Sequence, residues 1–400
     1  MRFWRRFSFL VILGFALTIF SFACTNLNQE TQTPQTPATQ NNDKPAISNL
    51  PPQTQEIVKT AGEDGLFNPP RGDVRLVAIS DLNSAYGSTD YDPEVDKGIN
   101  LLPFWEPDMV VCSGDMVAGQ KTSLTEAQIK AMWAAFDDHV AAPLRQANIP
   151  FGFTIGNHDA SGAKGEEGSF KFQEERDLAS EYWNDPEHDP GVEFIDKSQF
   201  PFFYTFKHKD IFFMAWDGST HRIPADKMVW VEKALASPEA QQAKMRILLS
   251  HLPLYAVAEG RNKFGAVMAD ADELRNMLEK YNVHTYISGH QHAYYPGHRG
   301  NLQLLHMGLM GSGPRALIGT EVRSAKAITV IDINFNSPEL TTYTTYDMKT
   351  LELIDYKQLP RFLTGHNGIV LRRDVEYQDL KAEEKAACVE KLDEKLCQNQ

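Results

Sequence analysis

Short runs of apolar residues recur along the chain, and they predict buried strands. Five of these runs come early, at residues 75–80, 109–113, 151–155, 246–250 and 284–288. Apolar residues at helical spacing predict helices at residues 125–146 and 272–281. A capping box of Ser123 and Glu126 is expected at the start of the first helix. Later runs at 302–307, 327–333 and 340–346 suit antiparallel partners, so the whole pattern predicts an α/β fold.

Polar residues follow each of the five early strands directly. In chain order they are Asp81-Leu82-Asn83, Gly114-Asp115, Gly156-Asn157-His158-Asp159, Ser250-His251 and Gly289-His290-Gln291-His292. Open α/β sheets hold their ligands at the carboxyl ends of strands, so these side chains are expected to meet at one site.

Carboxylate, amide and imidazole groups in this combination suit two divalent metal ions. Hydrolysis of a phosphate ester needs a nucleophile at neutral pH and neutralisation of the negative charge on the phosphoryl oxygens. Two ions about 3.5–4 Å apart supply both. His290 and His292 would point to the same side of an extended segment, so one could serve each metal. The candidate ligands are Asp81, Asn83, Asp115, Asn157, His251, His290 and His292.

The order of these motifs resembles that of the calcineurin-like metallophosphoesterase superfamily, whose pattern is Asp-x-His, Gly-Asp, Gly-Asn-His-Asp/Glu, His and Gly-His-x-His. The resemblance covers residues 74–346. It implies a four-layer α/β/β/α sandwich of two mixed sheets flanked by helices. It also implies two metal sites that share Asp115, the first with Asp81 and His292 and the second with Asn157, His251 and His290.

The same resemblance implies roles for the residues beside the metals. His158 would stabilise or protonate the departing oxygen, Asp159 would orient His158, and a metal-bound hydroxide would attack. Asn83 departs from the pattern, because the superfamily has a histidine there. An amide oxygen is a harder and weaker ligand than an imidazole, which favours oxygen-preferring metals such as Mn²⁺, with Fe and Zn as alternatives. Ala118 stands where purple acid phosphatases have tyrosine, so no purple charge-transfer site is expected.

Other side chains are candidates for the substrate cleft. Tyr86, His221 and Arg315 are the main ones, although Arg315 lies in a glycine-rich segment that a simple turn also explains. His298 and His306 could line the cleft too, but a lone histidine near a strand end is more often packed or solvated.

The start of the chain predicts export. Residues 1–23 contain Arg2, Arg5 and Arg6 before an apolar stretch, as in a signal peptide, and Cys24 would be lipidated after cleavage. An uncleaved membrane anchor is the alternative. Residues 24–70 are predicted to be a disordered tether, because their first part has hardly any large apolar residue. Residues 71–347 then form the catalytic domain, and 348–400 form an extension that ends in a helix.

The C-terminal helix is predicted at residues 376–397 and carries Cys388 and Cys397. One unbroken helix would separate these Cα atoms by about 13 Å, whereas a disulfide needs roughly 4.4–6.8 Å. Because an exported protein is in an oxidising compartment, we predict that the helix breaks and that the two cysteines bond.

Acidic residues outnumber basic ones, giving a formal net charge of −14 at pH 7. Removal of residues 1–23, which contain three arginines and no acidic residue, would make the charge more negative still. This composition argues against nucleic acid as a partner. The sequence predicts a membrane-tethered phosphomonoesterase for small phosphorylated compounds on the extracytoplasmic side. The alternatives are a phosphodiesterase for nucleotides or phospholipid headgroups, and a lipoprotein that binds metal or ligand without catalysis.

Overall fold

The computed structural model describes residues 47–61, 65–166 and 168–397, all of which belong to one compact unit, Lys44–Gln400. The predicted signal peptide and Cys24 lie outside the described residues. Within the described ranges, none of the helices combines the length and apolar character needed to span a membrane.

The first sheet contains the three early strands that precede the Asp-x-Asn, Gly-Asp and Gly-Asn-His-Asp motifs. Among the described residues its order is β12-β11-β1-β2-β3. Strands β1, β2 and β3 run parallel, while β11 and β12 complete the sheet antiparallel, as the sequence predicts. The strands are β1 Val74–Ile79, β2 Met109–Cys112, β3 Phe151–Phe153, β11 Ala327–Ile333 and β12 Thr341–Asp347.

The second sheet is larger and also mixed, with the order β13-β14-β9-β10-β8-β7-β6-β5-β4 in the described part of the chain. Strands β6, β7, β8 and β10 run parallel, and the outer strands are antiparallel. The strands are β4 Glu193–Gln199, β5 Phe203–His208, β6 Ile211–Ala215, β7 Met245–Leu249, β8 Thr285–Ser288, β9 Tyr295–Arg299, β10 Leu302–His306, β13 Phe362–Gly365 and β14 Gly368–Arg372.

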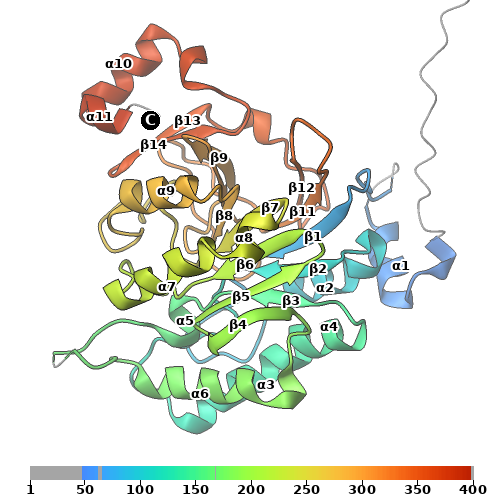
Figure 1. Cartoon of the computed structure of the whole chain (residues 1–400). Coiled ribbons are helices and arrows are strands. Elements are labelled where there is room, and N and C mark those ends of the chain that lie inside the picture. The colour runs from blue at the N-terminus through green and yellow to red at the C-terminus, as the bar shows by residue number, and fades with distance from the viewer. Residues whose placement is uncertain (1–46, 62–64, 167, 398–400) are drawn as a thin grey trace, which may run out of the picture. The chain divides into compact units, whose positions relative to one another are not determined.

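Helices cover the outer face of each sheet, which confirms the predicted four-layer sandwich (Figure 1). The first sheet is covered by α2 Pro93–Trp105, α3 Glu126–Phe136, α4 Ala142–Gln146 and α6 Gln173–Asn184. The second sheet is covered by α7 Ala225–Leu235, α8 Pro238–Gln242 and α9 Ala271–Lys280. A third core lies between the sheets, where Leu76 of β1 and Phe213 of β6 belong to the same buried cluster.

Alternation along the strands explains this layering. In β1, Leu76 and Ala78 belong to the core between the sheets, whereas Val77 and Ile79 belong to the core under the helices. Successive side chains of a strand point to opposite faces, so a strand that is apolar at every position must be buried on both. The same holds for β2, in which all four residues are buried. These two strands thus fix their carboxyl ends firmly inside the molecule.

The predicted helix at 125–146 is interrupted. A π-helical turn at Asp137–Ala141 lies between α3 and α4, next to Pro143, which lacks the N–H that a continuing α-helix would use. The expected capping box of Ser123 and Glu126 is wrong. The Thr125 side chain accepts from the backbone amide of Gln128 instead, because the N-cap lies two residues later than predicted.

The predicted boundaries also change at both ends of the chain. Helix α1 Pro52–Lys59 lies within the predicted tether and buries Val58. Its Thr54 Oγ1 donates a hydrogen bond to the Asn100 carbonyl of α2 at 2.7 Å. Residues 52–59 are therefore folded against the domain. At the other end, β13 and β14 extend the second sheet, so much of residues 348–400 is part of the sandwich.

The C-terminal helix is divided into α10 Ala382–Lys391 and α11 Glu394–Cys397. Between the two, the chain leaves the helical conformation at Leu392, so Cys388 and Cys397 come to lie with their Cα atoms 5.8 Å apart and form a disulfide. Both cysteines are buried against β14 in a small core of their own.

Candidate metal centre

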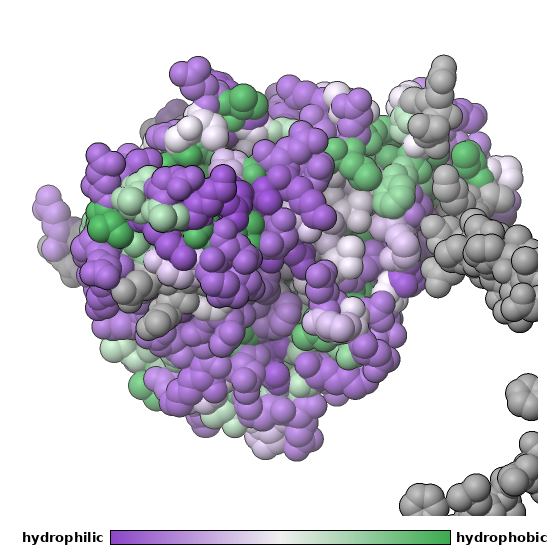
Figure 2. Space-filling model, turned by 90° about the horizontal axis from the view of Figure 1, so that it is seen from above, coloured by the Kyte–Doolittle hydropathy of each residue, from purple (hydrophilic) through white to green (hydrophobic). Residues whose placement is uncertain are grey.

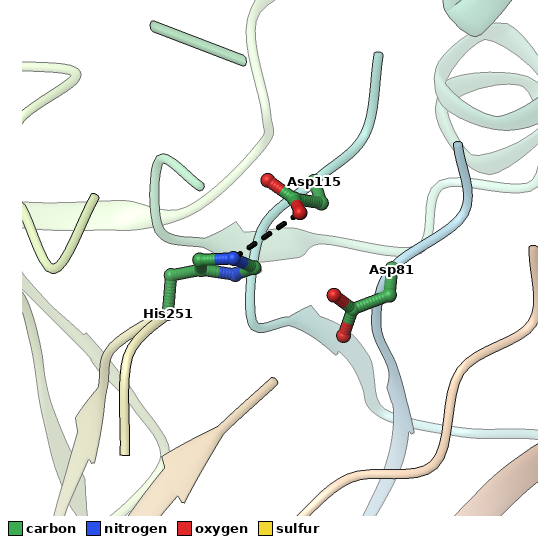
Figure 3. Close-up of side chains that lie close together, drawn as sticks. All are labelled: Asp81, Asp115 and His251. Carbon is green, nitrogen blue, oxygen red and sulfur yellow. Dashed lines mark ion pairs between the residues drawn. The ribbon is translucent and has the colours of Figure 1, made fainter. Parts of the chain in front are cut away.

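The strand ends of both sheets bring acidic, amide and imidazole groups together. Asp81 follows β1, Asp115 follows β2 and His251 follows β7. Ligand atoms of these three residues all lie within 4.8 Å of one another, and all three side chains are buried. Figure 3 shows them converging from three separate segments. Two carboxylates and an imidazole at this spacing make a site for a divalent metal.

The backbone turns sharply at four of the predicted ligands. Asp81, Asp115, His290 and His292 have φ values of 49°, 56°, 65° and 52°. Residues other than glycine seldom adopt this left-handed backbone conformation. Backbone strain of this kind is concentrated at functional sites. The segment from His290 to His292 is therefore not extended, contrary to the prediction. It is a turn held by Gln291 Oε1, which accepts from the amides of Val257 and Ala258.

His251 is fixed so that one ring nitrogen must bind a cation. Its Nδ1 donates to the Ser113 carbonyl at 2.8 Å, which directs Nε2 toward Asp115 Oδ2 at 3.2 Å and Asn157 Oδ1 at 2.9 Å. Three lone pairs thus face one another, and only a proton or a metal ion satisfies them. Although burial opposes the charged form, Asp115 raises the pKa of His251 to about 9.

Asn157 and His290 complete this part of the centre. His290 Nδ1 lies 2.8 Å from Asn157 Oδ1, and Asn157 Nδ2 donates to Gln120 Oε1 at 2.8 Å. Gln120 therefore turns the amide so that its oxygen faces both imidazoles. Arg261 Nη1 lies beside the same ring, 2.9 Å from Nδ1 and 2.5 Å from Nε2. Burial together with this charge lowers the pKa of His290.

His292 forms a similar pair with Asp81. Its Nδ1 donates to the Gly313 carbonyl at 3.0 Å, and its Nε2 lies 3.2 Å from Asp81 Oδ1. Burial opposes ionisation of Asp81, but the nearby His292 lowers its pKa. Asn83 is 6% exposed, and its side-chain amide makes no hydrogen bond to any residue that the structure describes. A histidine that donates one nitrogen to a carbonyl and presents the other to a carboxylate is typical of metal sites.

Asp115 lies between these groups. Besides its contact with His251, its Oδ1 accepts from the backbone amide of His158 at 2.8 Å. Burial raises its pKa, yet the charges of His251 and His158 outweigh burial and lower it. Asp115 is thus held as a carboxylate, the form that can bind a metal ion.

Asp159 has a different role from the expected one. Its carboxylate accepts from the backbone amides of Asp115, Met116, Val117 and Gly156, at 2.6–2.9 Å. It does not bond the ring of His158, so the predicted orienting role is wrong. The Gly119 carbonyl orients that ring instead, 3.1 Å from Nδ1. Burial and the charge of Asp115 raise the pKa of Asp159 to about 7. Asp159 shapes the loop that carries Asp115.

The site opens into a cleft of about 560 Å³. The three predicted substrate-cleft residues Tyr86, His221 and Arg315 line it, together with Asn157, His158 and His290. The ring of Tyr86 lies 5.1 Å from that of His158. Two cations that the sequence reasoning missed, Arg261 and Lys263, also line the cleft.

His298 and His306 do not lie in the cleft. His298 is 3% exposed and contacts the Val375 carbonyl, while His306 is 1% exposed and contacts the Tyr255 carbonyl. Burial lowers the pKa of His306 to about 4. Both are packed histidines.

Known proteins support the class that this site defines. The sequence profile of the calcineurin-like phosphoesterase family matches residues 74–294, more than half of the chain. The chain belongs to this family.

Solved structures align with this chain at low sequence identity. Purple acid phosphatase PPD1 from yellow lupin seeds aligns over 72% of this chain and 54% of its own, with 16% identity and a TM-score of 0.51. This chain thus spans about half the length of the lupin protein. A dimetal phosphatase from Danio rerio aligns over 65% of this chain and 93% of its own, with 13% identity and a TM-score of 0.42. A comparison with curated proteins finds no significant match.

Proposed function

We propose that this protein is a phosphomonoesterase that holds two divalent metal ions at the junction of its two sheets. The observation that carries the proposal is the pair of imidazole–carboxylate contacts, His251 with Asp115 and His292 with Asp81, both at 3.2 Å. In each pair the second ring nitrogen donates to a backbone carbonyl, so the nitrogen nearest the carboxylate carries a lone pair for a metal.

The donor groups suit two ions that share one ligand. Asp81, Asp115, His292 and Asn83 would hold the first ion, and Asp115, Asn157, His251 and His290 the second. Two such ions, when bound, supply a nucleophile at neutral pH and neutralise charge on the phosphoryl group. The mixture of oxygen and nitrogen donors suits Mn²⁺, Fe²⁺ or Zn²⁺.

The chain itself contributes a proton donor and a charged cleft. Because His158 Nδ1 donates to the Gly119 carbonyl, Nε2 is the atom that can give a proton to the departing oxygen. Arg261, Lys263 and Arg315 line the same cleft and add positive charge near His290. A phosphate monoester carries two negative charges near neutral pH and a diester one, so three cations favour the monoester.

Hydrolysis of p-nitrophenyl phosphate and of bis(p-nitrophenyl) phosphate tests the proposal. The protein, supplied in turn with Mn²⁺, Fe²⁺ and Zn²⁺, should hydrolyse the monoester at the higher kcat/KM. His158→Ala should keep its metals yet lower kcat by on the order of 10²–10⁴. His208→Ala is the control, because His208 lies at the end of β5 outside the cleft. A preference for the diester would favour a phosphodiesterase, and no turnover with any metal would favour a non-catalytic metal-binding protein.

We further propose that the enzyme is exported and tethered to a membrane through residues 1–24. The arginines and the apolar stretch before Cys24 support this proposal. Cys24→Ser should release the protein from membranes into the soluble fraction after cell breakage. Equal membrane association of the variant and the wild type would refute lipidation at Cys24.

A further inference from the structure

A second cavity lies next to the metal cleft and not at the metal centre. It has a volume of about 960 Å³, against about 560 Å³ for the cleft that contains His158 and His290. The two spaces share Ala163, Thr220 and His221 in their walls. The two spaces therefore adjoin at these three residues.

The walls of this cavity are largely apolar. They include Phe170, Phe200, Phe202, Phe203, Ile223 and Pro224. Figure 2 shows that the outside of the molecule, on the face in view, is mostly hydrophilic, with hydrophobic residues in separate groups. An apolar ligand thus finds more contact inside the cavity than on that face. The volume is within the range of pockets that enclose a small organic molecule, about 300–1,000 Å³.

The charged residues of the cavity already have partners. Arg176 is 7% exposed, lies between the rings of Phe170 and Phe202 at 4.2 and 3.8 Å, and pairs with Asp217 at 2.8 Å. Lys164 lies over the Phe170 ring at 3.2 Å. Because these cations are engaged, they close the cavity wall and leave its apolar surface as the main source of binding.

Arg222 and Lys227 are engaged as well. Arg222 pairs with Asp270, and Lys227 donates to Gln199. A second phosphate group would compete with these contacts, whereas an apolar group would not.

We infer that this cavity binds the organic part of the alcohol that is esterified to phosphate, and that the enzyme acts on phosphate monoesters of bulky apolar alcohols. The inference rests on the proposed phosphomonoesterase activity at the adjoining centre. The phosphoryl group would lie in the metal cleft beside His158, and the apolar group would extend past His221 into the larger cavity. Long alkyl chains and fused aromatic rings share this chemistry.

Binding of phosphonates tests the inference without turnover, because their carbon–phosphorus bond is not hydrolysed by a phosphoesterase. The full chain loaded with Mn²⁺ is titrated with methylphosphonate, octylphosphonate and naphthylmethylphosphonate by calorimetry. Burial of two methylene groups is worth about tenfold in affinity, so at least one bulky ligand should bind tenfold or more tightly than methylphosphonate. Which of the two binds better distinguishes a chain from a ring.

A matched pair of variants assigns the effect to the cavity. Ser180 of α6 lines the cavity and Glu174 of the same helix is exposed outside it, so Ser180→Trp fills the space while Glu174→Trp adds the same side chain elsewhere. Ser180→Trp should remove the tenfold preference, and Glu174→Trp should keep it. Ile223→Asp and its control Val229→Asp should repeat this contrast by adding charge, since Ile223 lines the cavity and Val229 is 70% exposed on α7.

Three results would overturn the inference: equal affinity for all three phosphonates, no binding of either bulky ligand, and a preference that survives both Ser180→Trp and Ile223→Asp. Its failure is separate from failure of the proposed function. Turnover of p-nitrophenyl phosphate without any preference for bulky phosphonates refutes the cavity alone, whereas tight bulky phosphonate binding without turnover refutes the activity alone.

Discussion

The two sides of the metal centre differ in how their asparagine amides are held. On one side, His251 and His290 both approach the Asn157 oxygen, and Gln120 fixes that amide from behind. On the other side, His292 contacts Asp81, while the Asn83 amide makes no hydrogen bond among the described residues. We call these the Asn157 side and the Asn83 side.

This difference indicates how tightly each side should hold its ion. A ligand that neighbouring groups already orient loses little freedom when the metal binds, whereas an unsupported amide must be ordered at that moment. The Asn157 side also has two imidazoles to the one on the Asn83 side. We therefore expect the Asn157 side to bind its ion more tightly and the Asn83 side to empty first.

Loss of the shared ligand should abolish the difference altogether. Asp115→Ala removes the carboxylate between the two sides, so both ions should be lost. The turnover number should fall by at least about 10³-fold, more than the removal of a single oxyanion donor costs. Metal content and kcat measured on the same preparation check this. Asp210→Ala, at a surface ion pair with Lys244, is the control. Retention of one tightly bound ion by Asp115→Ala would contradict a shared ligand.

Release of the Asn157 amide should weaken one side selectively. Gln120→Asn shortens the side chain that holds this amide, and asparagine tolerates the left-handed backbone at this position, where φ is 66°. Loss of such a supporting contact costs about 10–100-fold in metal affinity. Titration with a metal chelator should show that the tighter ion alone is weakened. The exposed Gln146→Asn should change neither affinity, and equal weakening of both ions would refute the assignment of Gln120 to one side.

Strengthening of the Asn83 side should reduce the difference. Asn83→His provides the imidazole that the superfamily pattern has at this position, and it should tighten the weaker ion by roughly tenfold. Activity at limiting metal should rise, and the gain should shrink at saturating metal. Asn83→Gln keeps the amide and serves as the control. Unchanged affinity in Asn83→His would show that residue 83 does not bind the metal.

In the metal-free protein, a proton on His251 should take the place of the metal on the Asn157 side. The stability of the metal-free protein should therefore depend on pH. The pKa of His251 is raised to about 9 from an unfolded value near 6.5, so its stabilisation is complete below about pH 6.5 and is lost as pH rises through 9. The melting temperature of the metal-free protein should therefore fall by a few degrees over this range. The metal-loaded protein should not show this loss. A flat profile for the metal-free protein would contradict the protonated His251.

The sequence predicted the fold because the fold depends on local patterns. Strands such as β1 and β11 are apolar at nearly every position, and the residues that follow them are short motifs. What the sequence could not predict depends on distant contacts. Gln120 meets Asn157 across 37 residues, and Asp159 serves backbone amides rather than its neighbour His158. A search for basic residues after the Ser250-His251 motif would have found Arg261.

The central claim is that one buried centre holds two ions of unequal affinity and uses them to hydrolyse a phosphate monoester. Native mass spectrometry of the wild-type protein during stepwise removal of Mn²⁺, with p-nitrophenyl phosphate turnover measured at each step, tests this claim most directly. The account predicts two ions at saturation, loss of one before the other, and loss of turnover with the first ion. A single ion at saturation, or turnover that is unaffected until the last ion leaves, would contradict it.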